Sequence, residues 1–278
     1  MQPVSPVETV PLFAPLLAEL LTLLRGLPAP AWSRPTLARQ WTVHDIAAHL
    51  LDGDLRKIAA SRDGQQLTPD RPLRSPRDLV DWLNGLNASG VQTFGRLSPR
   101  LLVDLLEVAG GWVINLLQAL PPHGSSLYPV AWAGEARSEN WMDIGREYTE
   151  RWHHQMQIRD AVGAALLLEP KWLDPLLDLS LRALPPVYAG CEAPDGAALT
   201  IEVTAQMNAA WTLRREHRGW ILYRGRSVAP TARITLDADV IWRVLYNAIT
   251  ADEARRRAAV EGDDRLIAPF FAARSVMV

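Results

Sequence analysis

Residues 41–61 read WTVHDIAAHLLDGDLRKIAAS. Apolar side chains recur three and four positions apart along it, as at Ile46 and Leu50, and this spacing predicts an amphipathic helix. Thr42 is suited to cap the helix, and Asp45, three residues later, completes a capping-box pattern. We therefore expect a helix from about Thr42 to the end of the stretch, with one face in a core.

Other segments of the first two thirds of the chain show the same helical spacing of apolar residues. Prolines at first helical positions and Gly or Pro at the ends mark their limits. These helices are expected at about Val7 to Arg25, Pro76 through Val91, about Pro99 to Leu120, about Ser138 to Gly163 and about Trp172 to Leu184, where two prolines should end the last one. The pattern predicts an antiparallel bundle of four or five helices.

The pattern changes after the two prolines. Apolar and polar residues alternate in four short segments, which predicts strands at Ala198 to Gln206, Ala210 to Arg214, Trp220 to Gly225 and Ala232 to Leu236, followed by three helices. We place a boundary near Pro185 to Pro194. The fold class expected is α with α+β, with a helical metal-binding domain over residues 1–188 and a small α+β domain over residues 189–278.

Composition excludes several classes of protein. The 278 residues are 48% hydrophobic and 22% charged with a net charge of −2, which is typical of a globular protein and gives no basic stripe for nucleic acid. The single cysteine, Cys191, fits a reducing compartment. Without a signal-peptide pattern or an apolar run long enough to span a bilayer, we expect a cytoplasmic protein with no membrane partner.

Three residues are candidates for metal ligands. Glu150 and His154 are four apart on one predicted helix, so they project from the same face, although such pairs also occur simply as solvated ion pairs. His49 is in the middle of another helix, where a lone histidine is more often a satisfied core residue. Together, two histidines and a carboxylate from two helices can form an open three-ligand site.

Two neighbours of these candidates have open interpretations. Asp45 is one turn before His49 and either orients its imidazole or only complements the helix dipole. His153 points about a quarter turn away from His154 and is expected to be a surface or hydrogen-bonded histidine.

Two segments resemble a known family. Residues 41–50, WTVHDIAAHL, are similar to the helix-two signature of mycothiol-dependent maleylpyruvate isomerases, which belong to the DinB-like metalloprotein superfamily. Residues 147–160, EYTERWHHQMQIRD, resemble the later helix that supplies a glutamate and, four residues on, a histidine. More loosely, the strand-rich tail resembles the sterol-carrier-like C-terminal domain of the same enzymes.

The resemblance implies that His49, Glu150 and His154 bind a divalent metal, usually zinc. Many relatives have an aspartate three residues after the second histidine, whereas this chain has Gln157, whose amide can still form a hydrogen bond.

The resemblance also implies an arginine of the C-terminal domain that holds a substrate carboxylate. Arg214, Arg224 and Arg226 are the candidates, because a guanidinium binds a carboxylate through two hydrogen bonds.

The activity implied is a metal-dependent reaction that uses a low-molecular-weight thiol such as mycothiol; bacillithiol or glutathione would face the same metal. Cys191 has no nearby base in the sequence, so the nucleophile would come from this thiol cofactor. Addition of the thiolate to maleylpyruvate would turn the cis double bond into a rotating single bond, and elimination would return the trans isomer. A thiol transferase would release the adduct.

Two other interpretations stay open. One is a non-catalytic module that binds a lipid or another small molecule and whose metal is structural. The other is a homodimer in which the bundle mainly forms the interface.

Overall fold

The computed structural model describes residues 1–276, and these fall into two compact units. The helical unit comprises Thr9–Leu127 and Glu150–Leu166. The sheet unit comprises Met1–Glu8, Tyr128–Thr149 and the described residues from Leu167 onward.

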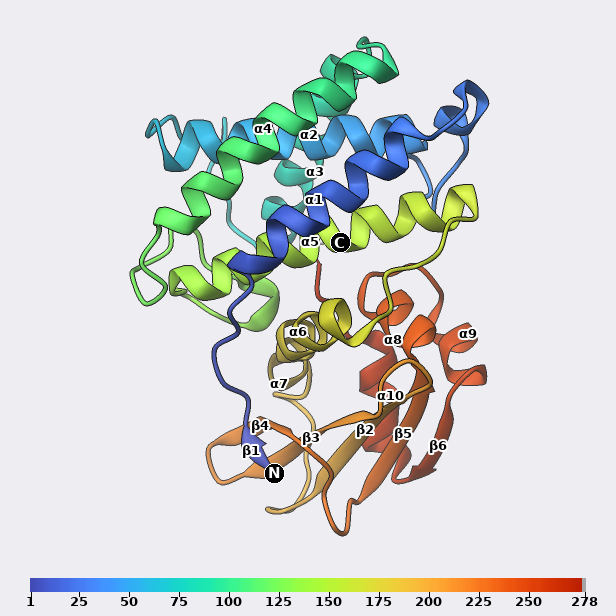
Figure 1. Cartoon of the computed structure of the whole chain (residues 1–278). Coiled ribbons are helices and arrows are strands. Elements are labelled where there is room, and N and C mark those ends of the chain that lie inside the picture. Colours follow the sequence, from blue (N-terminus) through green and yellow to red (C-terminus); the bar gives the residue numbers. More distant parts are fainter. Residues whose placement is uncertain (277–278) are drawn as a thin grey trace. The chain divides into compact units, whose positions relative to one another are not determined.

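The helical unit is built on five helices, which confirms the helical class expected for this part of the chain. They are α1 (Val10–Arg25), α2 (Val43–Ser61), α3 (Pro76–Phe94), α4 (Pro99–Ala119) and the second half of α5 (Asn140–Val162) (Figure 1). Helix α4 packs against both α1 and α2, and α3 packs against α2. The core between them consists almost entirely of aliphatic side chains.

Helix α2 begins as its sequence predicts. The Thr42 hydroxyl accepts a hydrogen bond from the Asp45 amide, and the Asp45 carboxylate accepts one from the Thr42 amide at 2.9 Å. Such a box satisfies amide groups that the helix start would leave unpaired. Residues 46–51 are all buried, so the part of α2 that carries His49 lies inside the unit.

Contrary to the expectation that no apolar run is long enough to span a bilayer, helix α4 is long and apolar enough to cross a membrane by length and composition alone. That test is also passed by core helices of soluble proteins, and α4 contributes Leu102, Leu106 and Val113 to the core of the helical unit.

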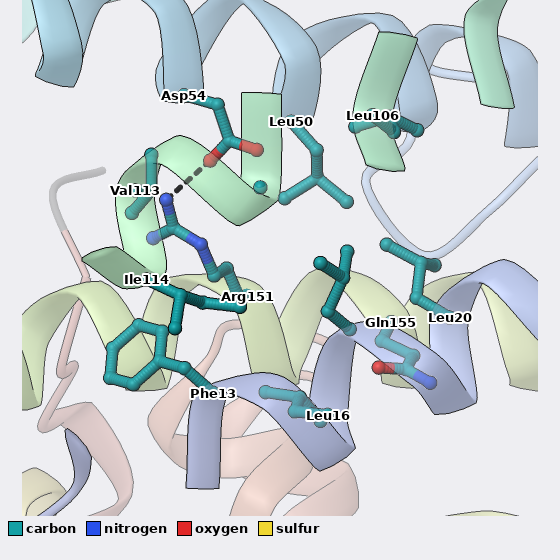
Figure 2. Close-up of a pocket in the computed structure, with 12 residues that line it drawn as sticks. Phe13, Leu16, Leu20, Leu50, Asp54, Leu106, Val113, Ile114, Arg151 and Gln155 are labelled. Carbon is teal, nitrogen blue, oxygen red and sulfur yellow. Dashed lines mark hydrogen bonds and ion pairs between the residues drawn. The ribbon is translucent and has the colours of Figure 1, made fainter. Parts of the chain in front are cut away.

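A narrow cavity of about 20 Å³ lies among α1, α2, α4 and α5 (Figure 2). Apolar side chains line most of it, and an ion pair between Asp54 of α2 and Arg151 of α5 borders it. The volume corresponds to about one water molecule. The ion pair links α2 to α5.

The sheet unit contains one mixed sheet with the strand order β1-β4-β3-β2-β5-β6. Strands β2 and β5 are parallel and the other neighbours antiparallel. The bounds are β1 (Gln2–Pro3), β2 (Ala198–Thr204), β3 (Ala209–Glu216), β4 (Gly219–Arg224), β5 (Ala232–Asp237) and β6 (Ala259–Gly262). Helices α8 (Ala238–Leu245) and α10 (Asp264–Ala272) pack against β5, and α9 (Ala251–Arg256) lies between α8 and β6 in the chain.

The four predicted strands are present within about two residues, and the small α+β domain is confirmed as a class. Strands β1 and β6 were not predicted. They are two and four residues long, too short to show a period-two pattern.

The division between the units differs from the single boundary expected near Pro185. Helix α6 (Pro170–Ser180) and α7 (Leu184–Val187) belong to the sheet unit. The indole of Trp211 on β3 donates a hydrogen bond of 2.7 Å to Asp178 of α6, and α7 packs against β4. Helical spacing does not show which part of the protein a helix packs against. For this reason the sequence alone assigns the helix that corresponds to α6 to the bundle.

The expectation that Pro185 and Pro186 end the preceding helix is wrong. Helix α6 ends at Ser180, a 3₁₀ turn follows, and both prolines lie within α7. Proline is tolerated in a first helical turn because its missing amide hydrogen has no partner there.

Two glycine variants test this packing. A Cβ on Gly145 of α5 would lie 2.5 Å from a methyl of Leu179, which is fully buried in α6 of the same unit. We expect Gly145→Ala to lower the free energy of unfolding by about 1–3 kcal/mol through overpacking. Gly111→Ala on α4 meets nothing within 4 Å and should raise it by about 0.5–1 kcal/mol. Urea denaturation measures both, and equal midpoints for the two variants would contradict the packing.

Candidate metal centre

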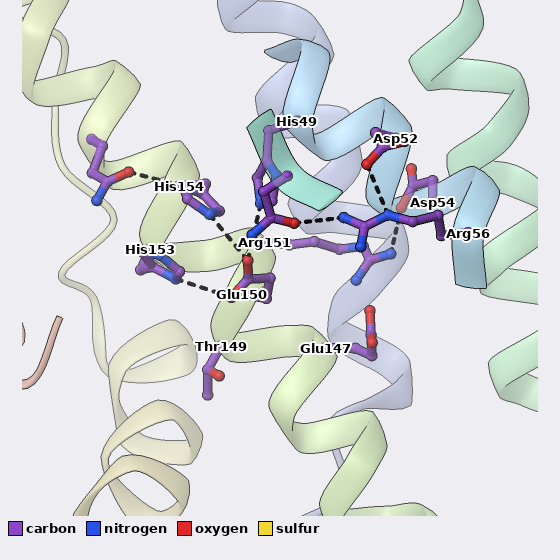
Figure 3. Close-up of polar contacts among 12 residues, drawn as sticks. His49, Asp52, Asp54, Arg56, Glu147, Thr149, Glu150, Arg151, His153 and His154 are labelled. Carbon is purple, nitrogen blue, oxygen red and sulfur yellow. Dashed lines mark hydrogen bonds and ion pairs between the residues drawn. The ribbon is translucent and has the colours of Figure 1, made fainter. Parts of the chain in front are cut away.

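Helices α2 and α5 bring the three candidate ligands together. His49 comes from α2, Glu150 and His154 come from α5, and one ligand atom of each lies within 4.8 Å of the other two (Figure 3). Nε2 of His49 lies 3.2 Å from Oε1 of Glu150, and Nε2 of His154 lies 3.1 Å from the same oxygen. Donors around a tetrahedral zinc ion at 2.0–2.2 Å lie about 3.4 Å apart, so the three atoms are spaced for one ion.

The donor chemistry of the site also fits a cation. Nδ1 of His154 lies 2.8 Å from Oε1 of Gln157, an oxygen that can only accept, so Nδ1 carries the hydrogen. In the neutral ring, Nε2 then presents a lone pair toward Oε1 of Glu150. Two acceptors at this distance repel each other unless positive charge is present between or beside them. A proton on the ring, or a metal ion at the centre, supplies it.

The pKa values describe a site ready for a metal. Burial raises the pKa of Glu150. In the metal-free site, the charge of a protonated His154 and the hydrogen bonds that His154 and His49 donate outweigh burial and hold the pKa of Glu150 well below its usual range. Burial lowers the pKa of His49, against the hydrogen bond to Glu150 that raises it. At neutral pH, Glu150 is therefore ionised and His49 is neutral, the states in which both bind metals.

Aromatic rings surround the two histidine ligands. The Trp41 ring centroid lies 4.7 Å from that of His49 and 6.0 Å from that of His154. The His153 ring lies 4.0 Å from that of His154. His153 is buried, so of the two expectations for it, a surface or a hydrogen-bonded histidine, the surface position is excluded. These rings restrict rotation of both ligands.

Asp45 serves as the helix cap and does not orient His49. Its carboxylate accepts from the amide and the hydroxyl of Thr42. Nδ1 of His49 is buried and has no hydrogen-bond partner in the part of the chain that the structure describes. His49 is instead held by its buried position on α2 and by the Trp41 ring.

The three candidate arginines lie in the sheet unit, each beside a carboxylate. Arg214 lies 3.6 Å from Glu216, and Arg226 lies 3.3 Å from Glu202. Arg224 pairs with Asp174 and, at 2.7 Å, with Asp178.

Arg224 also stacks over the Trp211 ring at 4.3 Å, so its guanidinium fastens α6 to the sheet. Of the three arginines it is the one most fully engaged in this unit. A role for any of them toward a substrate stays a prediction from the family resemblance.

A match to a known family model identifies the family of this chain. Residues 13–159, more than half of the chain, match the family model described as the mycothiol maleylpyruvate isomerase N-terminal domain. The chain belongs to the mycothiol-dependent maleylpyruvate isomerase family. The matched segment contains all three candidate ligands of this chain. No curated protein matches the sequence.

Solved structures of maleylpyruvate isomerases share the fold. A crystal structure of a histidine-to-alanine mutant of the mycothiol-dependent maleylpyruvate isomerase aligns with a TM-score of 0.54 and 12% identity over 91% of each chain. A second structure of the mycothiol-dependent maleylpyruvate isomerase aligns with a TM-score of 0.50 and 14% identity over 84% of this chain and 86% of that one. At this identity, the likeness shows the fold alone.

A third solved structure, described as a UbiJ-SCP2 ubiquinone synthesis protein, is 18% identical over 33% of this chain and 76% of its own, with a TM-score of 0.25. So low a score supports no conclusion. The sterol-carrier character of the sheet unit is therefore argued from its sequence alone.

Gln157 should control zinc affinity through His154. Gln157→Leu removes the acceptor that fixes the ring, and we expect the zinc dissociation constant to rise about 10–100-fold. Gln157→Glu keeps an acceptor and should bind zinc at least as tightly as the wild type. Competition with a chromophoric chelator measures the zinc affinity of all three proteins. Equal zinc affinities for Gln157→Leu and the wild type would contradict a role of Gln157 in zinc binding.

The lowered pKa of His49 predicts a pH dependence of stability. Below pH 6.5 the unfolded chain protonates His49 while the folded chain resists it, so the free energy of unfolding falls as the pH drops through this range. In metal-free protein, His49→Gln should lose part of the stability difference between pH 7.5 and 5.5. Chemical denaturation at both pH values measures it, and an unchanged difference would contradict the shift.

Proposed function

We propose that this chain is a divalent-metal-dependent, low-molecular-weight-thiol-dependent enzyme of the maleylpyruvate isomerase type. It acts as a cis–trans isomerase or thiol transferase on a small electrophile in the cytoplasm, with zinc as the metal and mycothiol as the thiol. The observation that carries the proposal is the convergence of Nε2 of His49, Oε1 of Glu150 and Nε2 of His154 around one point.

Each side chain at the centre has a defined task. His49, Glu150 and His154 would hold the ion and leave at least one coordination position open, as catalytic sites with three protein ligands do. A bound divalent ion lowers the pKa of a coordinating thiol and keeps it as the thiolate. Gln157 fixes the His154 ring so that Nε2 faces the centre, and Trp41 covers the two imidazoles on one side.

The state of Cys191 supports an external thiol. Its Sγ donates a hydrogen bond of 3.6 Å to the carbonyl oxygen of Arg265, and burial raises its pKa. At neutral pH this side chain is a protonated thiol and a poor nucleophile. The only cysteine in the sequence is thus unsuited to supply the thiolate, and a small-molecule thiol fills that role.

The alternative of a lipid-binding module gains nothing from the cavity between α1, α2, α4 and α5. Its volume of about 20 Å³ accommodates a water molecule, whereas pockets for small organic ligands measure about 300–1,000 Å³.

The test combines metal content with turnover. Elemental analysis of the purified chain should find about one divalent ion, and His154→Ala, which removes one of three ligands, should lose most of it. Mycothiol-dependent isomerisation of maleylpyruvate, followed by absorbance, should fall at least 100-fold in His154→Ala. His217→Ala, at an exposed turn of the sheet unit, is the control and should keep both properties.

Either of two results would reject the proposal. Unchanged metal content and turnover in His154→Ala would remove the centre from the chemistry. Bound metal without turnover on maleylpyruvate or other electrophiles, with mycothiol, bacillithiol or glutathione, would leave a structural metal and a binding function.

A further inference from the structure

Arg56 places a cation on the face of α2 that carries His49. The two residues are seven apart, which is two helical turns and about 10.5 Å along the axis. Side chains of a helix tilt toward its N-terminus, so the long arginine side chain reaches back along the helix. In Figure 3 the guanidinium of Arg56 extends toward His49, and its charge is one of the influences that lower the pKa of that histidine.

Two neighbours fix the guanidinium of Arg56 in one orientation. Its Nε lies 2.8 Å from Oδ2 of Asp52, in an ion pair, and its Nη2 donates a hydrogen bond of 2.7 Å to Oδ1 of Asn87 on α3. Gly90 on α3 makes room for the Asp52 carboxylate, because a Cβ at position 90 would collide with it. A guanidinium held at two of its edges is preorganised to bind through the third.

The remaining donors have no protein partner. In the part of the chain that the structure describes, no acceptor binds Nη1 of Arg56 or the amide nitrogen of Asn87. The Arg56 side chain is 27% exposed, so a ligand can reach it. A guanidinium edge beside an amide N–H is a donor pair suited to the two oxygens of a carboxylate. A purely structural link between α2 and α3 would need only the hydrogen bond from Arg56 to Asn87.

We propose that Arg56 and Asn87 bind a carboxylate of the substrate that reacts at the metal centre. This inference rests on the proposed function and narrows its substrate to a small electrophile that carries a carboxylate beside the reacting carbon. It also assigns carboxylate binding to the helical unit, in addition to any arginine of the sheet unit.

The experiment measures binding directly and needs no turnover. Isothermal titration of the zinc-loaded and the metal-free full-length protein uses maleate, and its neutral diamide, maleamide, as the uncharged comparison. Arg56→Gln should bind maleate about tenfold more weakly or worse, because one charge-assisted hydrogen-bond partner is lost, while maleamide binding stays the same. Arg62→Gln is the matched control, since Arg62 follows α2, is exposed and pairs with Asp63; it should behave as wild type.

A second variant guards against a folding defect in Arg56→Gln. Asn87→Asp is nearly isosteric and places an internal carboxylate against the guanidinium, which keeps the link between α2 and α3 but competes with the ligand. It should also weaken maleate binding about tenfold or more, with an unchanged melting temperature.

The outcomes separate this inference from the proposed function. Zinc retained by Arg56→Gln together with lost maleate binding supports the inference, whereas wild-type maleate affinity in both variants, or no maleate binding by the wild type, overturns it. Failure of the wild type to hold zinc would reject the proposed function, and titration of the metal-free protein would still decide whether Arg56 and Asn87 bind the carboxylate.

Discussion

A carboxylate oxygen that faces two imidazole nitrogens at 3.1 and 3.2 Å requires positive charge at the same place. This constraint governs the helical unit, because the charge has to be held by residues on two different helices. Because Nδ1 of His154 carries the hydrogen, its Nε2 directs a lone pair at the Glu150 carboxylate, and this repulsion is offset when a proton or a metal ion joins the two. The arrangement is therefore favourable for an ion-binding site and unfavourable for an empty core.

The rest of the helical unit keeps α2 and α5 in the relative position that this centre needs. The capping box at Thr42 fixes where α2 begins, and burial of residues 46–51 on every side holds this part of the helix inside the unit. The ion pair between Asp54 and Arg151 joins the same two helices one to two turns farther along α2. Arg159 of α5 pairs with Glu19 of α1 at 2.7 Å and fastens the other end of α5. Each link is modest by itself, but together they leave the ligands little freedom.

Two arginines of this chain differ in how many of their hydrogen-bond donors are engaged by protein groups. Arg224 has both nitrogens of its fork on carboxylates and its face on an indole ring, so its bonding capacity serves the sheet unit. Arg56 is held by Asp52 and Asn87 but retains an edge without a partner, in the unit that contains the metal centre. Sequence reasoning named only arginines of the sheet unit. The signal for Arg56 was its spacing of seven residues from His49 on one helix.

The sequence by itself determined the features that depend on neighbours along the chain. Helix periodicity, the Thr42 capping box, the alternation of β2 to β5 and the four-residue spacing of Glu150 and His154 are all local, and the structure contains each of them. The pairing of His49 with the second segment came from family resemblance, because 101 residues separate it from Glu150. Only the tertiary structure decided that α6 and α7 pack with the sheet, that His153 is buried and that Gly90 admits Asp52 beside Arg56. These depend on which surfaces meet across the chain, and periodicity carries no information about the partner of a helix face.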